Sequence, residues 1–226
     1  MVAAFAIAGP LQLLLSAAGR RNMVPPPFLA LIGWIAGLRV RVRGDIAPGK
    51  LLLISNHVSW LDILALAGAS RTSFVAQGGL AGHPFLKWLC DQNDTVFIAR
   101  ERRGTVAGQI EQVRRALERR RLTIFPEGTT SDGREMLPFK SALLSAVFEV
   151  GDTVTIQPVA LDYEDAPEIA WINGEPGMAN VKRILARTRP IRLTIHFLEP
   201  LAGAALTDRK AMAATARAAI DACLPL

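Results

Sequence analysis

A histidine and an aspartate five positions apart are the residues of this chain best suited to chemistry. His57 and Asp62 follow the apolar run 51–54, which predicts a short buried strand whose carboxyl end presents both side chains. An imidazole has a reference pKa of about 6.5, so it can accept a proton and return it at neutral pH. A nearby carboxylate can fix the ring tautomer and stabilise the imidazolium. The spacing therefore predicts a general base and leaves open which hydroxyl or thiol it activates.

Ser59 is the hydroxyl nearest to this pair in the sequence, and it is a weak candidate for a nucleophile. On a helix, two residues of separation would point the Ser59 and His57 side chains apart. No G-x-S-x-G elbow occurs in the chain. Ser59 is therefore expected to stand in the turn or to cap the following helix. The other histidines and the cysteines are expected to be structural or inert: His83, His196, Cys90 and Cys223.

Apolar runs and helical periodicities alternate along the chain around these residues. Strands are predicted at 51–54, 72–76, 95–99, 122–125, 154–161 and 191–197, and helices at 61–69, 105–121, 139–150 and 208–222. Strands separated by helices indicate an α/β fold, a single domain with a mixed, mostly parallel sheet flanked by helices. Residues 163–180, which contain several prolines and glycines, are expected to be the least regular region.

The N-terminal segment, residues 1–38, is mostly apolar and carries no charged side chain except the Arg20-Arg21 pair. The prolines at 25–27 are expected to break any helix there, which leaves 28–38 as a helical run. Spanning a bilayer takes about 20 apolar residues, so we expect a hairpin of short helices anchored in one leaflet. Trp34 and the arginines at 39, 41 and 43 would face the headgroups. The alternative is a pair of helices packed on the globular domain, 39–226.

Length, charge and ligand spacing limit the classes of function. The 226 residues suit one domain, and the net charge of +6 predicts an anionic partner such as a bilayer surface or coenzyme A. Nucleic acid is the weaker interpretation, because aromatic residues are sparse and no zinc-finger or RNP pattern occurs. No C-x-x-C or H-E-x-x-H spacing is present, so no metal site is expected.

Three further segments place polar residues or glycines at predicted strand ends. Arg100 and Arg103 follow the strand at 95–99, where they could bind a phosphate or lie in a solvated loop. Residues 125–133 follow the next strand; Glu127 could bind a substrate hydroxyl or an arginine, and the glycine and threonines after it could bind an anion. The third segment is an apolar strand that contains Pro158. Each is weak evidence when taken alone.

Together and in this order, the four segments resemble the glycerolipid acyltransferases typified by 1-acylglycerol-3-phosphate acyltransferases. The family block N-H-x-x-x-x-D matches Asn56, His57 and Asp62, and F-I-x-R-x-x-R matches the segment with Arg100 and Arg103. The block F-P-E-G-T matches residues 125–129, and the apolar strand with its proline matches 156–159. The resemblance covers about residues 35–200.

The resemblance implies transfer of a fatty acyl group from a thioester, on coenzyme A or acyl carrier protein, to a lysolipid hydroxyl. His57 would be the base and Asp62 its orienting partner, without an acyl-enzyme or a cofactor. Backbone N–H groups at the start of the following helix or in the Gly128 loop would bind the oxyanion. Residues 39–226 would then be the acyltransferase domain, at the cytoplasmic face of the inner membrane of a bacterium. The residues expected around the substrates are Asn56, Arg100, Arg103, Glu127, Gly128, Thr129, Thr130 and Lys140.

Thr130 departs from the family pattern and bears on the acceptor. Many phosphatidic-acid-forming members carry an arginine there, which would meet the acceptor phosphate. The segment around Thr130 looks like bacterial relatives that acylate other lysolipids, including lyso-ornithine lipid. We expect 1-acyl-sn-glycerol-3-phosphate first and lyso-ornithine lipid second. Two other classes stay open: a lysophospholipase or thioesterase that uses the same pair on water, and a non-catalytic protein that binds anionic lipid.

Overall fold

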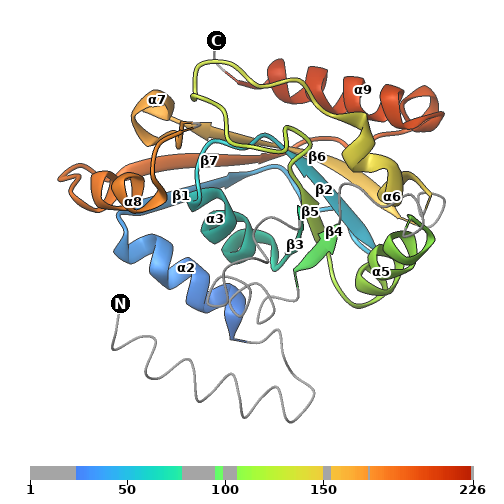
Figure 1. The fold of residues 1–226 in the computed structure, drawn as a ribbon, viewed down its shortest axis with the longest axis horizontal. Helices are drawn as coiled ribbons and strands as arrows, with labels where there is room; N and C mark the ends of the chain where they lie inside the picture. The colour runs from blue at the N-terminus through green and yellow to red at the C-terminus, as the bar shows by residue number, and fades with distance from the viewer. Residues whose placement is uncertain (1–23, 78–94, 99–105, 150–153, 173, 225–226) are drawn as a thin grey trace.

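The computed structural model describes residues 24–77, 95–98, 106–149, 154–172 and 174–224 (Figure 1). These residues form a seven-stranded sheet in the order β1-β7-β6-β2-β5-β3-β4. The strands are β1 (Leu38–Arg43), β2 (Leu51–Ser55), β3 (Ser73–Gln77), β4 (Val96–Ile98), β5 (Leu122–Ile124), β6 (Thr155–Tyr163) and β7 (Ile191–Phe197). β6 and β7 are antiparallel and the other neighbouring pairs are parallel. The predicted α/β domain with a mixed, mostly parallel sheet is confirmed.

Helices cover both faces of the sheet. One face carries α2 (Pro25–Ile35), α3 (Leu61–Ser70), α7 (Ala166–Ile169) and α8 (Gly177–Leu185), and the other α5 (Val106–Arg119), α6 (Ser145–Phe148) and α9 (Arg209–Asp221). Alternate residues of β2 divide between two cores: Leu51 and Leu53 pack with α3, whereas Leu52 and Ile54 pack with α5 and α9. All five residues of β2 are buried, as expected for a central parallel strand.

The central strands bring three chain segments to one edge of the sheet. β2 lies between β5 and β6 and is parallel to both. Ile54 is in register with Ile124, and Ser55 with Val159. The segments that begin at Asn56 and Phe125, and the last residues of β6, therefore meet at the carboxyl edge, where sheets of this kind build binding sites.

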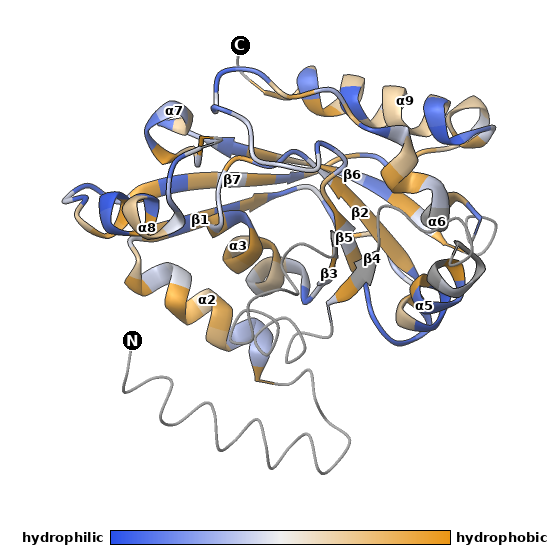
Figure 2. Cartoon of the chain, viewed as in Figure 1, coloured by the Kyte–Doolittle hydropathy of each residue, from blue (hydrophilic) through white to orange (hydrophobic). Residues whose placement is uncertain are grey.

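α2 begins at Pro25, so the prolines lie in the first turn of a helix that starts three residues before the predicted run, 28–38. A proline is tolerated in the first turn because the N–H that it lacks would have no intrahelical acceptor there. α2 packs closely on α3: a Cβ added to Gly68 would lie 2.7 Å from the Cβ of Ala30. The exposed large apolar side chains of α2 are Leu31, Trp34 and Ile35. Figure 2 shows much of α2 in the colour of hydrophobic residues.

Membrane association through the N-terminus stays a prediction. Residues 1–23 lie outside the described residues. Within the described ranges, no helix has both the length and the apolar character needed to cross a bilayer. α2 shares features of both expected arrangements, because one side packs on the domain and the other presents apolar side chains to the surroundings.

Three elements differ from the prediction. β1 was not predicted, because five of its six residues are exposed and its arginines hide the strand pattern. The helix predicted at 139–150 is a 3-10 turn, Ser141–Leu144, followed by the short α6; the Lys140 N–H donates to the Pro126 carbonyl and keeps the start of the segment extended. The region 163–180 contains α7 and the start of α8.

Candidate active site

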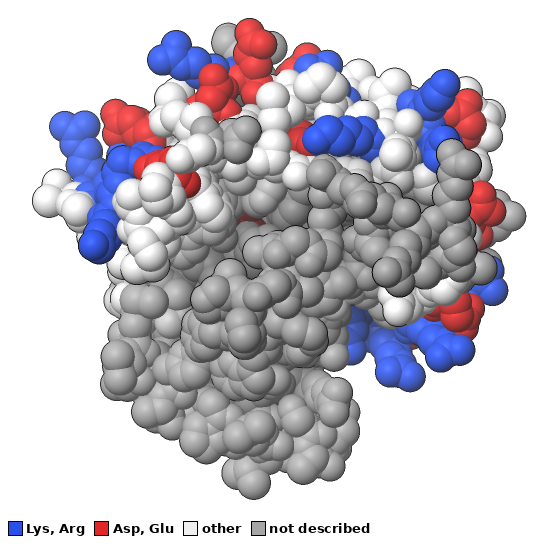
Figure 3. Space-filling model, in the orientation of Figure 1, with Lys and Arg blue, Asp and Glu red and all other residues white. Residues whose placement is uncertain are grey.

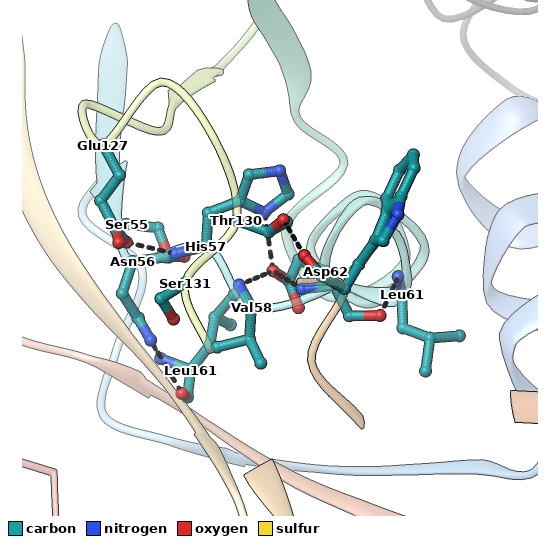
Figure 4. A network of polar contacts seen from close by, with 12 residues as sticks. Ser55, Asn56, His57, Val58, Leu61, Asp62, Glu127, Thr130, Ser131 and Leu161 are labelled. Carbon is teal, nitrogen blue, oxygen red and sulfur yellow. Dashed lines mark hydrogen bonds and ion pairs between the residues drawn. The ribbon is translucent and has the colours of Figure 1, made fainter. Parts of the chain in front are cut away.

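The His57 ring is held by the Asp62 carboxylate directly after β2 (Figure 4). His57 Nδ1 lies 2.8 Å from Asp62 Oδ2, and the two side chains are 19% and 0% exposed. Oδ2 also accepts hydrogen bonds from the Val58 and Ser59 N–H groups, at 2.7 and 2.9 Å. An oxygen that accepts two N–H bonds is a carboxylate acceptor, so Nδ1 carries the proton that it donates. The other nitrogen, Nε2, is then free to accept a proton.

The loop geometry and the helix start both favour a charged Asp62. Asp62 lies in the first turn of α3, where the helix dipole stabilises a negative charge. Its own N–H donates to the Ser59 carbonyl and closes the turn. The spacing of five residues therefore places a carboxylate directly below the imidazole, as the sequence predicts.

Tyr163, at the end of β6, donates its hydroxyl proton to Asp62 Oδ1 at 2.6 Å. The side chain is buried and comes from a strand 101 positions away in sequence. The sequence analysis did not find this residue. Tyr163 is the only tyrosine in the chain and ends the strand that contains the fourth family-like segment, 156–159, which is the one signal that could have pointed to it.

Phe125 forms one wall of the site. Its ring stacks on the His57 ring, with centroids 4.1 Å apart and planes inclined by 16°. The Phe74 ring, on β3, stacks in turn on the Phe125 ring, with centroids 6.0 Å apart. The first residue of the F-P-E-G-T segment therefore fixes the plane of the imidazole, a role that the sequence pattern did not disclose.

Glu127 holds the backbone of the His57 loop. Its Oε1 accepts the His57 N–H at 2.7 Å and its Oε2 accepts the Leu137 N–H at 2.9 Å. The side chain is 0% exposed. Burial raises the pKa of Glu127 to about 7, against the opposing effect of these two backbone hydrogen bonds. This placement differs from the predicted contact with a substrate hydroxyl or an arginine, because both oxygens already bind backbone groups inside the protein.

Asn56 also braces the loop. Its side-chain amide donates to the Leu161 carbonyl at 3.1 Å and its oxygen accepts the Leu161 N–H at 2.8 Å. These two bonds extend the pairing of β2 with β6 by one residue, through a side chain. Asn56 is buried, so the structure places it behind the His57 loop, away from solvent.

Ser59 is buried and belongs to the turn. Its N–H binds Asp62, and its hydroxyl oxygen is 3.5 Å from the Leu61 N–H. No hydrogen bond joins Ser59 to the His57 ring in the described part of the chain, which agrees with a turn residue. The His57 carbonyl is fixed as well, because it accepts the Ser131 N–H at 2.8 Å.

The residues after Glu127 form a turn at the mouth of the site. Gly128 has a φ of +73°, which favours glycine, and its N–H donates to the Phe125 carbonyl. Thr129 is exposed. The Thr130 hydroxyl donates to the Trp171 carbonyl. Lys140 is exposed and joins the same loop through its backbone.

A second cluster, which sequence reasoning missed, secures the segment before α8. Trp171 donates its backbone N–H to the Val58 carbonyl at 2.9 Å and so reaches the His57 loop. Trp60 donates its indole N–H to Asn180, whose amide in turn binds Glu175 at 2.7 Å. Arg183 pairs with the same Glu175 carboxylate at 3.1 Å. The segment before α8 is therefore tied to both sides of the turn that holds His57 and Asp62.

Two predicted substrate ligands, Arg100 and Arg103, lie outside the described residues, so their place in the site stays a prediction. Among the described residues, no cluster of three or more His, Cys, Asp or Glu side chains could hold a metal ion.

Comparison with known proteins gives the family. The acyltransferase family model matches residues 39–162. Lyso-ornithine lipid O-acyltransferase from Brucella abortus is 34% identical over 223 residues, which cover 91% of this chain and 83% of that protein. 1-acyl-sn-glycerol-3-phosphate acyltransferase from Neisseria gonorrhoeae is 36% identical over 153 residues, which cover 67% of this chain and 58% of that protein.

A solved structure shares the fold. The crystal structure of the 1-acyl-sn-glycerophosphate acyltransferase PlsC from Thermotoga maritima matches 95% of this chain and 86% of its own, with a TM-score of 0.68 and 20% identity. The chain therefore belongs to the acyltransferase family. The predicted family and enzyme class, an O-acyltransferase, are confirmed.

Proposed function

We propose that this enzyme transfers a fatty acyl group from an acyl thioester to the free hydroxyl of a lysolipid. The observation that carries the proposal is the state of the His57 ring. Nδ1 is held by Asp62, and within the described residues no hydrogen bond joins Nε2 to the protein or the ring to a serine or cysteine. A base without a protein nucleophile suits direct attack by a substrate hydroxyl.

The proposed reaction is a single displacement at the thioester carbonyl. His57 Nε2 takes the proton of the lysolipid hydroxyl while the oxygen attacks the carbonyl carbon. Asp62 stabilises the imidazolium that forms. When the tetrahedral intermediate collapses, the carbon–sulfur bond breaks and the imidazolium returns its proton to the thiolate. The products are a diacylated lipid and a free thiol, on coenzyme A or acyl carrier protein.

The oxyanion needs donors that the protein does not already use. The Val58 and Ser59 N–H groups bind Asp62, and the Gly128 N–H binds Phe125. The Val58, Ser59 and Gly128 N–H groups are therefore not available to the oxyanion. The Thr129 and Thr130 N–H groups have no acceptor in the described part of the chain, and they lie in the loop that Glu127 ties to His57. We assign the oxyanion to this loop.

Replacing His57 tests the reaction. We expect His57→Ala to lower kcat by roughly 10²–10⁴-fold with little change in KM, because general-base assistance is lost while the binding surfaces remain. The measurement is thiol release by purified full-length enzyme in detergent with acyl thioester and lysolipid. A thioesterase would release thiol without the lysolipid, and a lysophospholipase would release fatty acid from the lysolipid alone. A non-catalytic binder would release no more thiol than the variant.

Thr130 and the relatives favour lyso-ornithine lipid as the acceptor, with 1-acyl-sn-glycerol-3-phosphate as the second candidate. The Thr130 side chain is uncharged and its hydroxyl already donates to the Trp171 carbonyl, so it offers an acceptor phosphate neither a cation nor a free donor. The match to a lyso-ornithine lipid acyltransferase covers 91% of this chain, whereas the match to a 1-acyl-sn-glycerol-3-phosphate acyltransferase covers 67%. This order reverses the one expected from the sequence alone.

An arginine at position 130 separates the two acceptors. We expect Thr130→Arg to raise kcat/KM for 1-acyl-sn-glycerol-3-phosphate relative to lyso-ornithine lipid by about tenfold, the size of one charge-assisted hydrogen bond. Thr129→Arg is the matched control, because it adds the same charge at the exposed neighbouring position. Equal ratios in the two variants would contradict a role for position 130 in acceptor choice.

The enzyme is further proposed to bind the cytoplasmic face of a bacterial inner membrane through residues 1–38. The exposed Leu31, Trp34 and Ile35 of α2 support this surface, and the Arg39 guanidinium lies 5.1 Å from the Trp34 ring centroid. Lys and Arg side chains also gather over α5 and α8 (Figure 3). Sedimentation with vesicles tests the proposal: Trp34→Ala should weaken binding to anionic vesicles, and unchanged binding would contradict a membrane contact by α2.

A further inference from the structure

Tyr163 supplies the only hydrogen bond that the described residues give to one oxygen of Asp62. Oδ2 accepts three bonds, from the His57 ring and from the Val58 and Ser59 N–H groups. Oδ1 accepts one bond, from the Tyr163 hydroxyl at 2.6 Å. Asp62 is 0% exposed and Tyr163 4% exposed, so solvent does not replace this donor.

The position of the Tyr163 hydroxyl is set by the sheet. Tyr163 is the last residue of β6 and is in register with Leu193 of the antiparallel strand β7. Its ring packs in the core shared by α3 and the sheet. The hydroxyl therefore meets Asp62 from a rigid element, which is the kind of support that holds a reactive side chain in one orientation.

The surroundings of the Tyr163 hydroxyl favour its protonated form. Burial raises the pKa of Tyr163 well above its usual value, and the charge of Asp62 and the hydrogen bond to it act in the same direction. The Tyr163 hydroxyl therefore acts as a hydrogen-bond donor to Asp62. Without the hydroxyl, Oδ1 would be a buried charged oxygen with no donor among the described residues, and the carboxylate would be held from one side alone.

We propose that Tyr163 is a positioning residue of the acyl transfer: it fixes the Asp62 carboxylate so that Oδ2 stays below the His57 ring as the imidazolium forms. The inference rests on the proposed function, because it concerns the step in which His57 takes the lysolipid proton. It predicts an effect on turnover and none on substrate binding, since the Tyr163 hydroxyl contacts Oδ1 of Asp62 and the His57 ring contacts Oδ2.

Kinetics of Tyr163→Phe test the role. The variant keeps the ring and loses the hydroxyl. We expect kcat to fall by about tenfold, as for the loss of a hydrogen bond to a charged group, while KM for both substrates is unchanged. Thr123→Val is the matched control, because it removes another buried hydroxyl. The Thr123 hydroxyl, on β5, is bonded to the Thr72 hydroxyl at 2.9 Å. The proposal is overturned if kcat is unchanged, or if Thr123→Val lowers kcat and Tm to the same extent.

The single tyrosine offers a second test that does not depend on activity. Tyrosinate formation, followed by ultraviolet absorbance during alkaline titration, reports Tyr163 alone because the chain has one tyrosine. In Asp62→Asn we expect tyrosinate to form at a lower pH than in the wild type, since the neighbouring charge is gone. Glu127→Gln, which alters a different buried carboxylate of the site, should leave the titration where it is. An equal midpoint in Asp62→Asn and wild type would overturn the contact.

The two tests separate this inference from the proposed function. A wild-type enzyme that releases thiol with lysolipid, together with an equally fast Tyr163→Phe variant, rejects the positioning role alone. A wild-type enzyme that is inactive with every lysolipid rejects the proposed function, and the titration still decides whether Tyr163 donates to Asp62. A purified Tyr163→Phe variant that does not fold leaves the titration of wild type and Asp62→Asn as the deciding measurement.

Discussion

Two loops at the carboxyl edge of the sheet each carry a fully buried carboxylate, and the two acids are held differently. Asp62, after β2, accepts four hydrogen bonds, two of them from side chains. Glu127, after β5, accepts two, both from backbone N–H groups. The pKa of Glu127 is raised to about 7 by burial. The first carboxylate is thus held by side chains and backbone together beside a base, whereas the second joins two loops at a site where burial makes its charge costly.

Removing the charge of the first loop should have the largest effect. We expect Asp62→Asn to lower kcat by about 10²–10⁴-fold, because the amide can satisfy the wrong ring tautomer and cannot stabilise the imidazolium. Thiol release by the purified variant measures the effect, and circular dichroism checks the fold. A kcat within a few-fold of wild type would show that Asp62 and Glu127 do not differ in the way that their hydrogen bonds indicate.

The titration of Glu127, in the second loop, should contribute to the pH dependence of the free energy of unfolding. Because the folded-state pKa of Glu127 is raised from 4.5 to about 7, the folded protein keeps a proton that the unfolded chain has released. Its contribution to the free energy of unfolding is complete below pH 4.5 and is lost as pH rises through about 7, a change of about 3 kcal/mol. Denaturant titrations of wild type and Glu127→Gln between these pH values measure it as a difference. Parallel curves would contradict the raised pKa.

Glu127→Gln should also lower turnover, by less than Asp62→Asn. The amide oxygen can accept one of the two N–H groups, from His57 or from Leu137, and leaves the other buried without an acceptor, at a cost of about 1–3 kcal/mol. We expect a lower Tm and a kcat reduced by about tenfold. Glu135→Gln, an exposed position in the same loop, is the control. Equal activities of the two variants would show that the His57 backbone does not need this support.

The smallest effect is expected at the contact between the two loops. Phe125→Leu removes the ring that stacks on His57. Aromatic pairs contribute about 0.5–1.5 kcal/mol beyond buried area, so kcat should fall by about three- to tenfold. The measurement is again thiol release at saturating substrate. A larger loss than in Glu127→Gln would show that the ring plane, more than the backbone, limits the base.

The sequence disclosed the residues of the site better than their partners. His57 and Asp62 are close in the chain, so their spacing was enough to place the carboxylate below the ring. Glu127 was recognised as part of the site, but its contact with the His57 N–H joins positions 70 apart, and no local pattern encodes such a bond. Tyr163 was missed for the same reason, as its partner lies 101 positions away.

The fold followed from periodicity where a core face exists. Val113 and Leu117 of α5 are buried, as the helical spacing predicts, and β2 was recognised because both of its faces are covered. The periodicity failed where burial is one-sided or absent. β1 is almost wholly exposed, and the prolines of α2 were read as breakers although the first helical turn accepts them.

β1 bears on how copies of this enzyme behave at high concentration. In the described part of the sheet it is an edge strand, and an edge strand offers unpaired backbone groups to another chain. Arginine occupies alternate positions of this strand, at 39, 41 and 43. A second copy that added its own β1 would bring these cations against one another, and the repulsion would oppose the pairing. The charge that suits an anionic bilayer would therefore also protect the enzyme from aggregation through its sheet.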